Sequence, residues 1–542
     1  MTTRIMSFIF FVWFATDIAG QSLTDLVHIM DYSSSGAGAI TADENFYYLA
    51  FGDADSVFIG GESYLDVNNQ SVILKRQENT IWSKIIHSGY ANQVTEMKID
   101  VEGNLIAVGY SYWVSDITID DLTGYGQTFI AKIDPDGNAL WLKVYSNFYA
   151  TAVDVDCSNH IIIGGHFAGT IDFAGEQFTS ESMWPDFPYN VAVLGLDSEG
   201  EEIWGRAIPG NFMDTTFDLI TDSNCDIYLS GSMNAGNMIL QNDTLLSGAF
   251  LIKMNSSGED LWSKNISGFL DEGITSSVIG KNLCINSNGE VYWLFHMKGD
   301  SITTELGTIE VSDCAMFVSP RVHILLRLNS AGTLLSQQGF QCSDSFTEYW
   351  DLQSIGDQIA VAGDYNTEIS IPSGQILETP DNVVNTFFML TNPDLIDVWH
   401  INSQNTDIFS WVKTRQIVKW GDKIILKGTF LSEFNMGNFE LESVDQGDLF
   451  LAFFDLNTMV PHLNSPDNEL VIYPNPVTDL MNLRIPQDIP FTSLDIYDSM
   501  GRRVHSQTSA ASIWVGDFPN GFYHVLIRTE NSMITTSFIK CD

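Results

Sequence analysis

Short apolar runs separated by glycine-containing turns follow one another along most of this chain, and Gln127–Tyr145 (QTFIAKIDPDGNALWLKVY) shows the pattern most clearly. Phe129, Ala131 and Ile133 occupy alternate positions, which is typical of a β-strand. The sequence DPDGN that follows predicts a tight turn, because proline presets φ at an early turn position and glycine readily adopts a positive φ. This stretch is therefore predicted to form a β-hairpin.

The hairpin recurs at a regular interval, and its return strand carries a large apolar residue at the position of Trp141. Aligning the copies on this anchor position gives an average spacing of about 63 residues. The anchor positions are Trp82, Trp141, Trp204, Trp262, Ser336, Trp399 and His462. Ser336 and His462 are placed by their spacing and by the strand-like runs HILLRLN and LFLAFFD that precede them.

A second motif lies between the anchors, and it consists of a turn followed by an apolar strand, as in DVEGNLIAVG at Asp100–Gly109. The last position of this motif falls at Gly61, Gly109, Gly165, Gly231, Phe295, Gly363 and Gly428. Seven copies of each motif alternate, so each unit holds about four short strands. This repetition without helical periodicity predicts an all-β, seven-bladed β-propeller over residues 22–463. Chance turn chemistry in a glycine-rich β-protein is the alternative.

The ring of a propeller must be closed, because an open ring leaves unpaired strand edges. The last unit ends at Pro461, which lacks the N–H that a strand ladder needs. Near the N-terminus, Leu26–Tyr32 resembles the anchor strand Leu140–Ser146. We therefore expect this N-terminal strand to join the last blade and close the ring.

The repeats GNLIAVGYS, HIIIGGHFAGTIDFAG and FIAKIDPDGNALW resemble those of a secreted seven-bladed β-propeller repeat family of bacteria. The resemblance covers about residues 40–463 and implies the same fold.

The N-terminal residues 1–20 have the features of a signal peptide. Arg4 is followed by the apolar run Ile5–Ala15 and by the small residues Ala19 and Gly20. The run is too short to cross a bilayer comfortably, and no later segment is predicted to span a membrane.

The repeat period ends at a polar linker, residues 464–469 (NSPDNE). The runs that follow are LVIYPNPVTDLMNLRI, SLDIYDSMGRRV, SIWVGDFPNGFYHVLIRT and MITTSFIK. They alternate strands with tight turns and predict a small immunoglobulin-like β-sandwich over residues 470–542.

This C-terminal segment resembles the type A C-terminal sorting domain of the type IX secretion system of Bacteroidetes. The residues that match its motifs are Pro474, Asn475, Pro476, Gly501, Pro519, Gly521, Tyr523 and Lys540. Phe518 stands where the family has leucine, and Thr535 and Thr536 stand where it often has lysine. The resemblance implies export through the periplasm to the outer cell surface or the medium, with the type IX machinery as a partner.

The chain carries a formal net charge of −45, which argues against nucleic acid as a partner. The turn DPDGN has the composition of a calcium loop, but the equivalent turns DSEGE, NSSGE and NSAGT lose the paired carboxylates, and no glutamate ends a twelve-residue loop. We therefore interpret it as a turn and predict no metal site and no cofactor.

Six cysteines without a CxxC spacing argue against a zinc site. Cys314 and Cys342 are a candidate disulfide pair, and the remaining cysteines are expected to be buried thiols.

No catalytic residue can be assigned, because the sequence lacks a GxSxG elbow, an HExxH helix and a phosphate-binding glycine loop. Neither the histidines His160 and His166 nor carboxylate pairs such as Asp154 with Asp156 carry a catalytic signature. The leading hypothesis is a non-catalytic propeller that binds a glycan or a protein, or serves as a scaffold. The alternatives are an extracellular hydrolase or lyase with its site in the propeller channel and, third, a quinoprotein-like oxidoreductase.

The sequence does not identify the residues that bind a ligand. The five anchor tryptophans are expected to pack blade against blade, whereas Trp113, Trp184 and Trp350 lie outside the period and are candidates for stacking on a sugar. Buried ionisable groups in the channel would favour an enzyme, and a polar funnel would favour binding.

Overall fold

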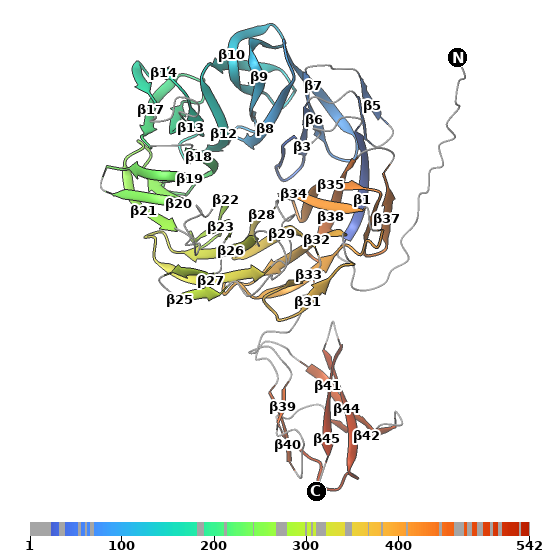
Figure 1. Cartoon of the computed structure of the whole chain (residues 1–542). Coiled ribbons are helices and arrows are strands. Elements are labelled where there is room, and N and C mark those ends of the chain that lie inside the picture. The colour runs from blue at the N-terminus through green and yellow to red at the C-terminus, as the bar shows by residue number, and fades with distance from the viewer. Residues whose placement is uncertain are drawn as a thin grey trace, which may run out of the picture. The chain divides into compact units, whose positions relative to one another are not determined.

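The computed structural model of this chain consists of β-strands joined by turns, and no helix occurs among the residues it describes (Figure 1). The described residues are 23–31, 38–52, 56–59, 62–65, 70–180, 189–210, 214–241, 243–266, 279–298, 301–304, 307–310, 321–341, 350–366, 368–380, 383–407, 410–443, 447–459, 471–473, 480–484, 491–498, 502–507, 512–529 and 533–540. The chain divides into two compact units, Met1–Leu395 with Trp399–Val460, and Pro461–Asp542 with Ile396–Val398.

The first unit is a β-propeller in which antiparallel strands form successive sheets around a central opening (Figure 1). Its first three sets of strands are β2 (Ile40–Ala42), β3 (Tyr47–Gly52), β6 (Gln70–Arg76) and β7 (Thr80–Ser88); β8 (Asn92–Ile99), β9 (Leu105–Ile119), β10 (Leu122–Ile133) and β11 (Ala139–Tyr145); and β12 (Phe148–Val155), β13 (Ile161–Phe167), β16 (Asn190–Leu196) and β17 (Glu202–Ile208).

The chain continues in the same manner. The next sets are β18 (Asp214–Thr221), β19 (Ile227–Ile239), β20 (Thr244–Met254) and β21 (Asp260–Ile266); β22 (Ile279–Ile285), β23 (Val291–Lys298), β26 (Arg321–Leu328) and β27 (Leu334–Gln341); β28 (Trp350–Ile355), β29 (Gln358–Asn366), β32 (Val384–Thr391) and β33 (Asp397–Asn402); and β34 (Trp411–Trp420), β35 (Lys423–Leu431) and β38 (Asp448–Asp455), which β1 (Leu23–Asp31) completes.

Short hairpins extend several of these sets. They are β4 (Ser56–Ile59) with β5 (Glu62–Leu65), β14 (Thr170–Phe173) with β15 (Glu176–Thr179), β24 (Ser301–Thr304) with β25 (Gly307–Glu310), β30 (Glu368–Ser370) with β31 (Ile376–Glu378), and β36 (Glu433–Met436) with β37 (Phe439–Glu442). Hydrogen bonds also join β7 to β9 and β32 to β34, so neighbouring sets merge into larger sheets. The number of sheets therefore does not give the number of blades, and the predicted number of seven blades stays a prediction.

The N-terminal strand closes the ring, as the sequence predicts. β1 pairs antiparallel with β38 from Leu23 opposite Phe454 to Ile29 opposite Leu449. β38 pairs on its other side with β35, so strands from the two ends of the propeller share one sheet. This pairing satisfies the edge of β38 that would otherwise be free.

The predictions for the first and last repeats need correction. The outer strand of the last set is β1, whereas the anchor placed at His462 lies outside the described residues. In the first set the second strand is β3, not the run that ends at Gly61, a residue also outside the described part of the chain. The neighbouring β4 pairs with β1 instead. The strands at the two ends of the propeller therefore pair to close the ring and do not follow the repeat pattern of the other sets.

The anchor tryptophans dock one sheet on the next, which confirms their interpretation as blade packing. The indole N–H of Trp141 donates to the carbonyl of Ser198 at 3.2 Å, and the ring lies against Gly200 in the same turn. Gly200 has φ of 82°, and a β-carbon there would lie 2.9 Å from the ring. Trp82 and Trp262 make the same bond, to Pro135 and Ser330.

A buried lysine accompanies the tryptophan, and the sequence interpretation missed it. Lys132 pairs across the strands with Trp141, and its ammonium donates to the same Ser198 carbonyl at 2.9 Å. Lys132 also forms an ion pair of 2.8 Å with Asp100, and both side chains are buried. Lys75 and Lys253 repeat the arrangement at Pro135 and Ser330. One turn carbonyl thus receives two donors from the preceding sheet.

A disulfide joins Cys157 and Cys225, whose α-carbons lie 5.1 Å apart. The expectation that both are thiols was wrong, because these residues occupy the turns after β12 and β18, which neighbouring sets bring together. Cys284 is a buried thiol. The candidate pair Cys314 and Cys342 lies outside the described residues.

The C-terminal unit contains two sheets. β39 (Val471–Tyr473), β40 (Leu480–Arg484) and β43 (Ser512–Trp514) form one, and β42 (Arg503–Gln507), β41 (Phe491–Asp498), β44 (Gly521–Thr529) and β45 (Met533–Lys540) form the other. The immunoglobulin-like topology stays a prediction. So do the boundaries at 463 and 470, because residues 460–470 lie outside the described part.

The closing strand makes a testable contribution to stability. Ile29 on β1 is fully buried, whereas Ile81 on β7 is 55% exposed. We expect Ile29→Ala to lower the free energy of unfolding by about 2–4 kcal/mol, because it removes buried methyl groups and leaves a cavity. The matched change Ile81→Ala should cost less than about 1 kcal/mol. Urea unfolding of the two variants checks this, and equal effects would contradict closure by β1.

Candidate functional site

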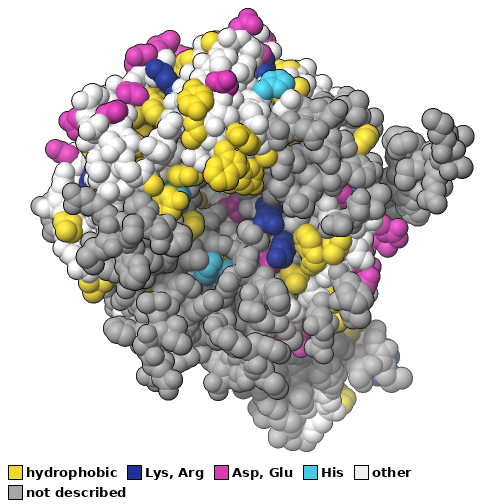
Figure 2. Space-filling model, turned by 45° about the horizontal axis from the view of Figure 1, so that its top comes forward, with side chains coloured by type: hydrophobic (Ala, Val, Ile, Leu, Met, Phe, Trp, Pro, Cys, Tyr) yellow, Lys and Arg dark blue, Asp and Glu magenta, His cyan; other side chains and the backbone are white. Residues whose placement is uncertain are grey.

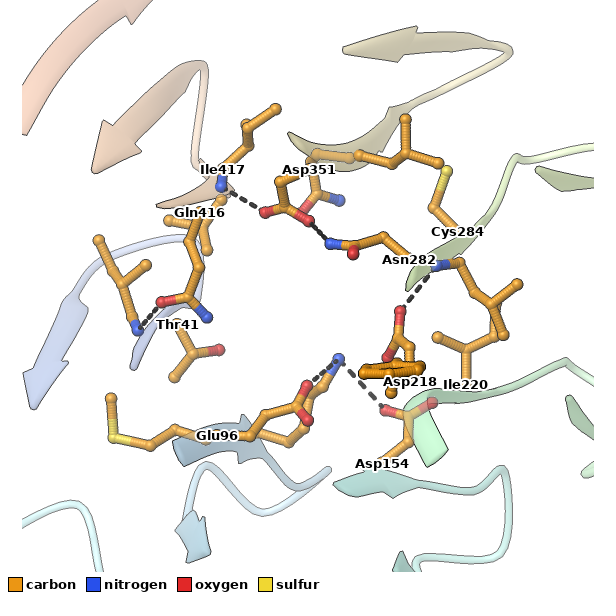
Figure 3. Close-up of a pocket in the computed structure, with 18 of the residues that line it drawn as sticks. Thr41, Glu96, Asp154, Asp218, Ile220, Asn282, Cys284, Asp351, Gln416 and Ile417 are labelled. Carbon is orange, nitrogen blue, oxygen red and sulfur yellow. Dashed lines mark hydrogen bonds and ion pairs between the residues drawn. The ribbon is translucent and has the colours of Figure 1, made fainter. Parts of the chain in front are cut away.

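The inner strands of the propeller line a central channel with a cavity of about 430 Å³. β2, β8, β12, β18, β22, β28 and β34 each contribute side chains. Figure 3 shows that the carboxyl side chains of Glu96, Asp154, Asp218 and Asp351 converge here. Lys98 also lines the cavity. The sequence could not bring these residues together, because they come from strands far apart in the chain.

Lys98 is the basic centre of this group. Its ammonium lies 3.7 Å from Glu96 and 3.9 Å from Asp154. Burial by itself lowers the pKa of Lys98, but the carboxylates of Asp154 and Glu96 outweigh burial and raise it above its ordinary value. Lys98 therefore stays charged in the channel.

Most of the channel carboxylates accept backbone hydrogen bonds from the next sheet. The N–H of Val153 donates to Glu96 at 3.1 Å, and that of Thr221 donates to Asp154 at 2.7 Å. The remaining bonds run from Leu283 to Asp218 at 2.7 Å, from Ile417 to Asp351 at 2.7 Å, and from Ile40 to Gln416 at 3.0 Å. We call Glu96, Asp154, Asp218, Asp351 and Gln416 the channel acceptors. They connect five pairs of neighbouring inner strands, including β34 and β2, and the side chain of Asn282 on β22 donates to Asp351 on β28.

A β-bulge places several of these residues. The strand ladder skips one residue in each of five inner strands, at Thr95, Thr151, Phe217, Lys281 and Arg415. In β8, β18 and β34 a channel acceptor follows the bulge directly. A bulge re-aims the side chains around it, so the same device recurs from sheet to sheet. Glu96 and Asp218 also lie four residues before a turn aspartate, a spacing that the repeat alignment could have revealed.

Burial raises the pKa of the Glu96 and Asp218 carboxyls, and the charge of Lys98 opposes that rise. Burial likewise raises the pKa of Asp351 to about 6, against the effect of the Ile417 N–H. Shifted carboxyls are a property of many active sites, but structural networks shift them too. Because each of these carboxyls holds a backbone amide, their geometry favours a structural role.

The structural role predicts different outcomes for two changes at Asp351. Asp351→Asn keeps an oxygen that accepts from the Ile417 N–H, whereas Asp351→Ala leaves this N–H without its partner. We expect the alanine variant to lose about 1–3 kcal/mol of unfolding free energy and the asparagine variant clearly less. Chemical denaturation at neutral pH measures both, and equal losses would contradict the role.

A second cavity, of about 570 Å³, opens beside the channel, and we call it the mouth basin. Figure 2 shows apolar side chains gathered at one margin of the central hollow, with charged side chains inside it. The residues that line the basin are Gln93, Thr95, Tyr110, Tyr112, Gln127, Tyr149, Ala150, Thr151, His166, Thr215, Thr216 and Phe217. Thr95, Thr151 and Phe217 line the channel as well, so the two cavities adjoin each other at these residues.

Aromatic rings build one wall of the mouth basin. Tyr149 stacks on His166 with centroids 5.4 Å apart, and Tyr189 meets both rings edge-on. Tyr110 and Tyr112 form a second pair at 5.7 Å. The side chain of Gln93 donates to the Tyr110 hydroxyl. These contacts hold the rings in place before any ligand arrives.

The described lining of the mouth basin is neutral. Among the residues that the structure describes there, none is aspartate, glutamate, lysine or arginine. Burial lowers the pKa of His166 to about 4, so its imidazole is neutral. This is unusual surface in a chain with a net charge of −45.

Asp214 lies directly before Thr215 and is fully buried. Neither of its carboxylate oxygens has a hydrogen-bond partner within the described structure. Burial raises the pKa of this carboxyl to about 8, so the folded protein keeps the proton that the unfolded chain releases near pH 4. The free energy of unfolding therefore falls as the pH rises from about 4 to about 8.

Asp214→Asn should remove this part of the pH dependence. We expect the variant to resemble the parent below about pH 4 and to be more stable above pH 8, by on the order of a few kcal/mol. Asp121→Asn removes an exposed carboxylate and serves as the control. Thermal unfolding between pH 4 and 9 measures the slopes, and parallel curves for Asp214→Asn and the parent would contradict the buried proton.

The tryptophans that the sequence offered for stacking on a sugar differ in their exposure. Trp113 is 68% exposed on β9, directly after Tyr112 of the basin. Trp350 was a wrong candidate, because it is only 2% exposed and stacks on His323 at 4.0 Å. Trp184 lies outside the described residues. His166 belongs to the basin, whereas His160 lies 3.1 Å from Asp156 in a turn.

Part of the sorting motif is visible in the C-terminal unit. The hydroxyl of Tyr523 donates to the carbonyl of Pro519 at 2.7 Å, and Gly521 pairs with Lys540. Tyr523 and Lys540 are both buried. Pro474, Asn475, Pro476 and Gly501 lie outside the described residues. No helix in the described part of the chain is long and apolar enough to cross a membrane.

Comparison with known proteins identifies the C-terminal unit. Residues 471–541 match a family described as the secretion system C-terminal sorting domain. The chain is therefore a β-propeller protein that carries a type IX sorting domain and is exported to the cell surface or secreted.

The propeller is similar to proteins of low sequence identity. Over 226 residues, 40% of this chain, it is 24% identical to an uncharacterized WD repeat-containing protein of Acanthamoeba polyphaga mimivirus, of whose length the match spans 15%. The C-terminal WD40 domain of Sif2 is 11% identical, with coverage of 80% of this chain and 99% of that one and a TM-score of 0.36. The Dos1 propeller is 7% identical, with 78% and 93% coverage and a TM-score of 0.35. At these scores the propeller assignment rests on the strand pairing.

Proposed function

We propose that this exported propeller is a non-catalytic binding protein that holds a neutral carbohydrate in the mouth basin. The observation that carries the proposal is an uncharged, aromatic cavity in a strongly acidic protein. Its volume of about 570 Å³ is in the range of about 300–1,000 Å³ that is usual for small-ligand sites.

The chemistry of the lining supports a sugar as the ligand. Sugars present apolar C–H faces that stack on aromatic rings, and Tyr149, Tyr112 and Phe217 offer such rings. Sugar hydroxyls both donate and accept hydrogen bonds, and the amides of Gln93 and Gln127 can do the same. The described lining residues carry no acidic or basic side chain, which favours a neutral glycan over an acidic one.

The second candidate function is cleavage of a glycan in the channel, by a hydrolase or a lyase reaction. The raised pKa values of the Glu96 and Asp218 carboxyls are the observation that favours it. We place it second because both carboxyls accept a backbone N–H from the next sheet. The oxidoreductase alternative depends on the repeated tryptophans. Because these tryptophans pack against turn glycines, the structure gives this alternative no further support.

We extend the proposal to export. Residues 1–20 are removed during export. The remaining chain consists of a propeller at 22–463, a linker at 464–469 and a sorting domain at 470–542. The type IX machinery recognises the C-terminal unit, and the motif residues Pro519, Gly521, Tyr523 and Lys540 give it the required shape. The mature protein acts outside the cell after passage through the periplasm.

A glycan array probed with the full chain tests the binding function. We expect binding to neutral oligosaccharides and at least a tenfold loss of affinity in Tyr149→Ala, because the stacking platform is removed. Tyr125→Ala is the matched control, since Tyr125 is 69% exposed and is not part of the basin lining.

The array also separates the alternatives. Binding that survives Tyr149→Ala would place the site elsewhere, and binding lost in Trp113→Ala alone would move it to that exposed ring. Shortened products released from a bound glycan would favour the enzyme. No binding to any glycan would overturn the carbohydrate proposal.

A further inference from the structure

Three consecutive apolar side chains are exposed beside the mouth basin. Tyr112 is 46% exposed, Trp113 68% and Val114 38%, and we call these three residues of β9 the ridge. Side chains of a regular strand alternate between its two faces, so three neighbours are not expected to be exposed together. A run of exposed apolar residues is usual only where the surface binds something.

The pairing of β9 with β10 explains how the ridge is exposed. Tyr110 pairs with Thr128, and Ser115 pairs with Gly126. Four residues of β9 therefore lie opposite one residue of β10, and a bulge of this kind interrupts the alternation of side chains. Ser111 and Ser115 at the two ends of the ridge are buried, and their hydroxyl oxygens lie 3.4 Å apart.

An equivalent hairpin of the propeller lacks large apolar residues at this place. β19 and β20 also pair on both sides of a bulge, two sets of strands further along the chain. Counted from the repeat glycines Gly109 and Gly231, the positions of the ridge hold Asn234, Ala235 and Gly236 in β19. A bulged hairpin of this fold therefore does not require the ridge, and binding of a ligand gives a reason for it.

Neighbouring residues hold the backbone of the ridge in place. The N–H of Tyr112 donates to the carbonyl of Ala91 at 3.0 Å, and the side-chain amide of Gln127 donates to the Tyr112 carbonyl at 3.4 Å. The ring of Tyr112 packs edge-on against Tyr110. A surface that is already ordered loses little conformational entropy when a ligand binds.

The ridge extends the mouth basin. Tyr112 lines the basin together with Gln127, and Trp113 follows Tyr112 directly but is not among the described lining residues. A ligand that fills the basin and continues past Tyr112 therefore reaches Trp113 next. Asp116, one residue beyond Ser115, is also exposed, and its carboxylate disfavours an acidic ligand.

We propose that the ligand is a chain of linked neutral sugar units, with one unit in the mouth basin and a later unit stacked on Trp113. This inference rests on the proposed function, because it extends the same site. The indole offers a large flat apolar surface to the C–H face of a sugar. A glycan too short to leave the basin cannot reach the indole, so affinity depends on the length of the glycan.

Oligomers of glucose, of mannose and of xylose, each from one to six units long, test this inference by isothermal titration of the full chain. We expect the affinity of at least one series to rise by about tenfold between two units and six, because the longer oligomer gains the contact with Trp113. Trp113→Ala should cost about tenfold in affinity for the six-unit oligomer and less than about twofold for the two-unit oligomer, whereas Tyr149→Ala should weaken both. Trp113→Phe keeps an aromatic ring and should retain most of the dependence on length.

Trp514→Ala is the matched control, since Trp514 is 57% exposed and belongs to the C-terminal unit. Affinity that does not change with length, or that rises equally in Trp113→Ala, would overturn this inference and leave the proposed function intact. An equal loss at every length in Trp113→Ala would place the whole ligand on the ridge and overturn the division into two parts. No binding of any oligomer would also overturn the inference, and no binding on the glycan array as well would overturn the proposed function.

Discussion

Closure of the ring is the constraint on which the rest of this structure depends. A strand edge exposes a row of unpaired N–H and C=O groups, and a circular arrangement of sheets removes the free edge only when its two ends meet. Here β1 supplies the last strand, and its pairing with β38 fixes where the propeller begins and ends. The docking of Trp141 and Lys132 on one turn carbonyl then repeats between neighbouring sheets, so the sheets are held at a regular spacing.

Within this frame the channel and its mouth serve different purposes. The side-chain oxygens of the channel acceptors accept hydrogen bonds from backbone amides of the neighbouring strand, and these bonds stabilise the ring from inside. The bulge residues Thr95, Thr151 and Phe217 lie where the channel meets the mouth basin. Charged side chains in the channel thus stabilise the ring, and the aromatic surface beside it is the site where we propose that a ligand binds. The C-terminal unit carries the export signal in a separate compact part of the chain.

Much of the architecture could be predicted because it follows from local chemistry. The hairpin around Asp134–Asn138 depends on turn residues within a few positions of one another, and the period of the anchors depends only on counting. The sorting domain was identifiable from motifs that keep their order in the sequence. Leu26–Tyr32 was recognisable as the closing strand because it retains the pattern of an outer strand.

The remainder depends on contacts between residues far apart in the chain. The disulfide between Cys157 and Cys225 requires two equivalent turns to meet, which spacing alone does not reveal. The mouth basin combines Tyr110, Tyr149 and Phe217 from three sets of strands, and none of them carries a local signature. Trp350 was misjudged because exposure is a tertiary property. A lysine opposite three of the anchor tryptophans, Lys75, Lys132 and Lys253, was visible in the repeat, but the carbonyl to which it donates lies in the next sheet.

Hydrogen–deuterium exchange of the exported protein, read by mass spectrometry, tests ring closure most directly. If β1 completes the last sheet, peptides that cover Leu23–Asp31 will be protected to the same degree as those that cover Asp448–Asp455. Exchange of Leu23–Asp31 at the rate of an unstructured peptide, with Asp448–Asp455 still protected, would contradict the closed ring.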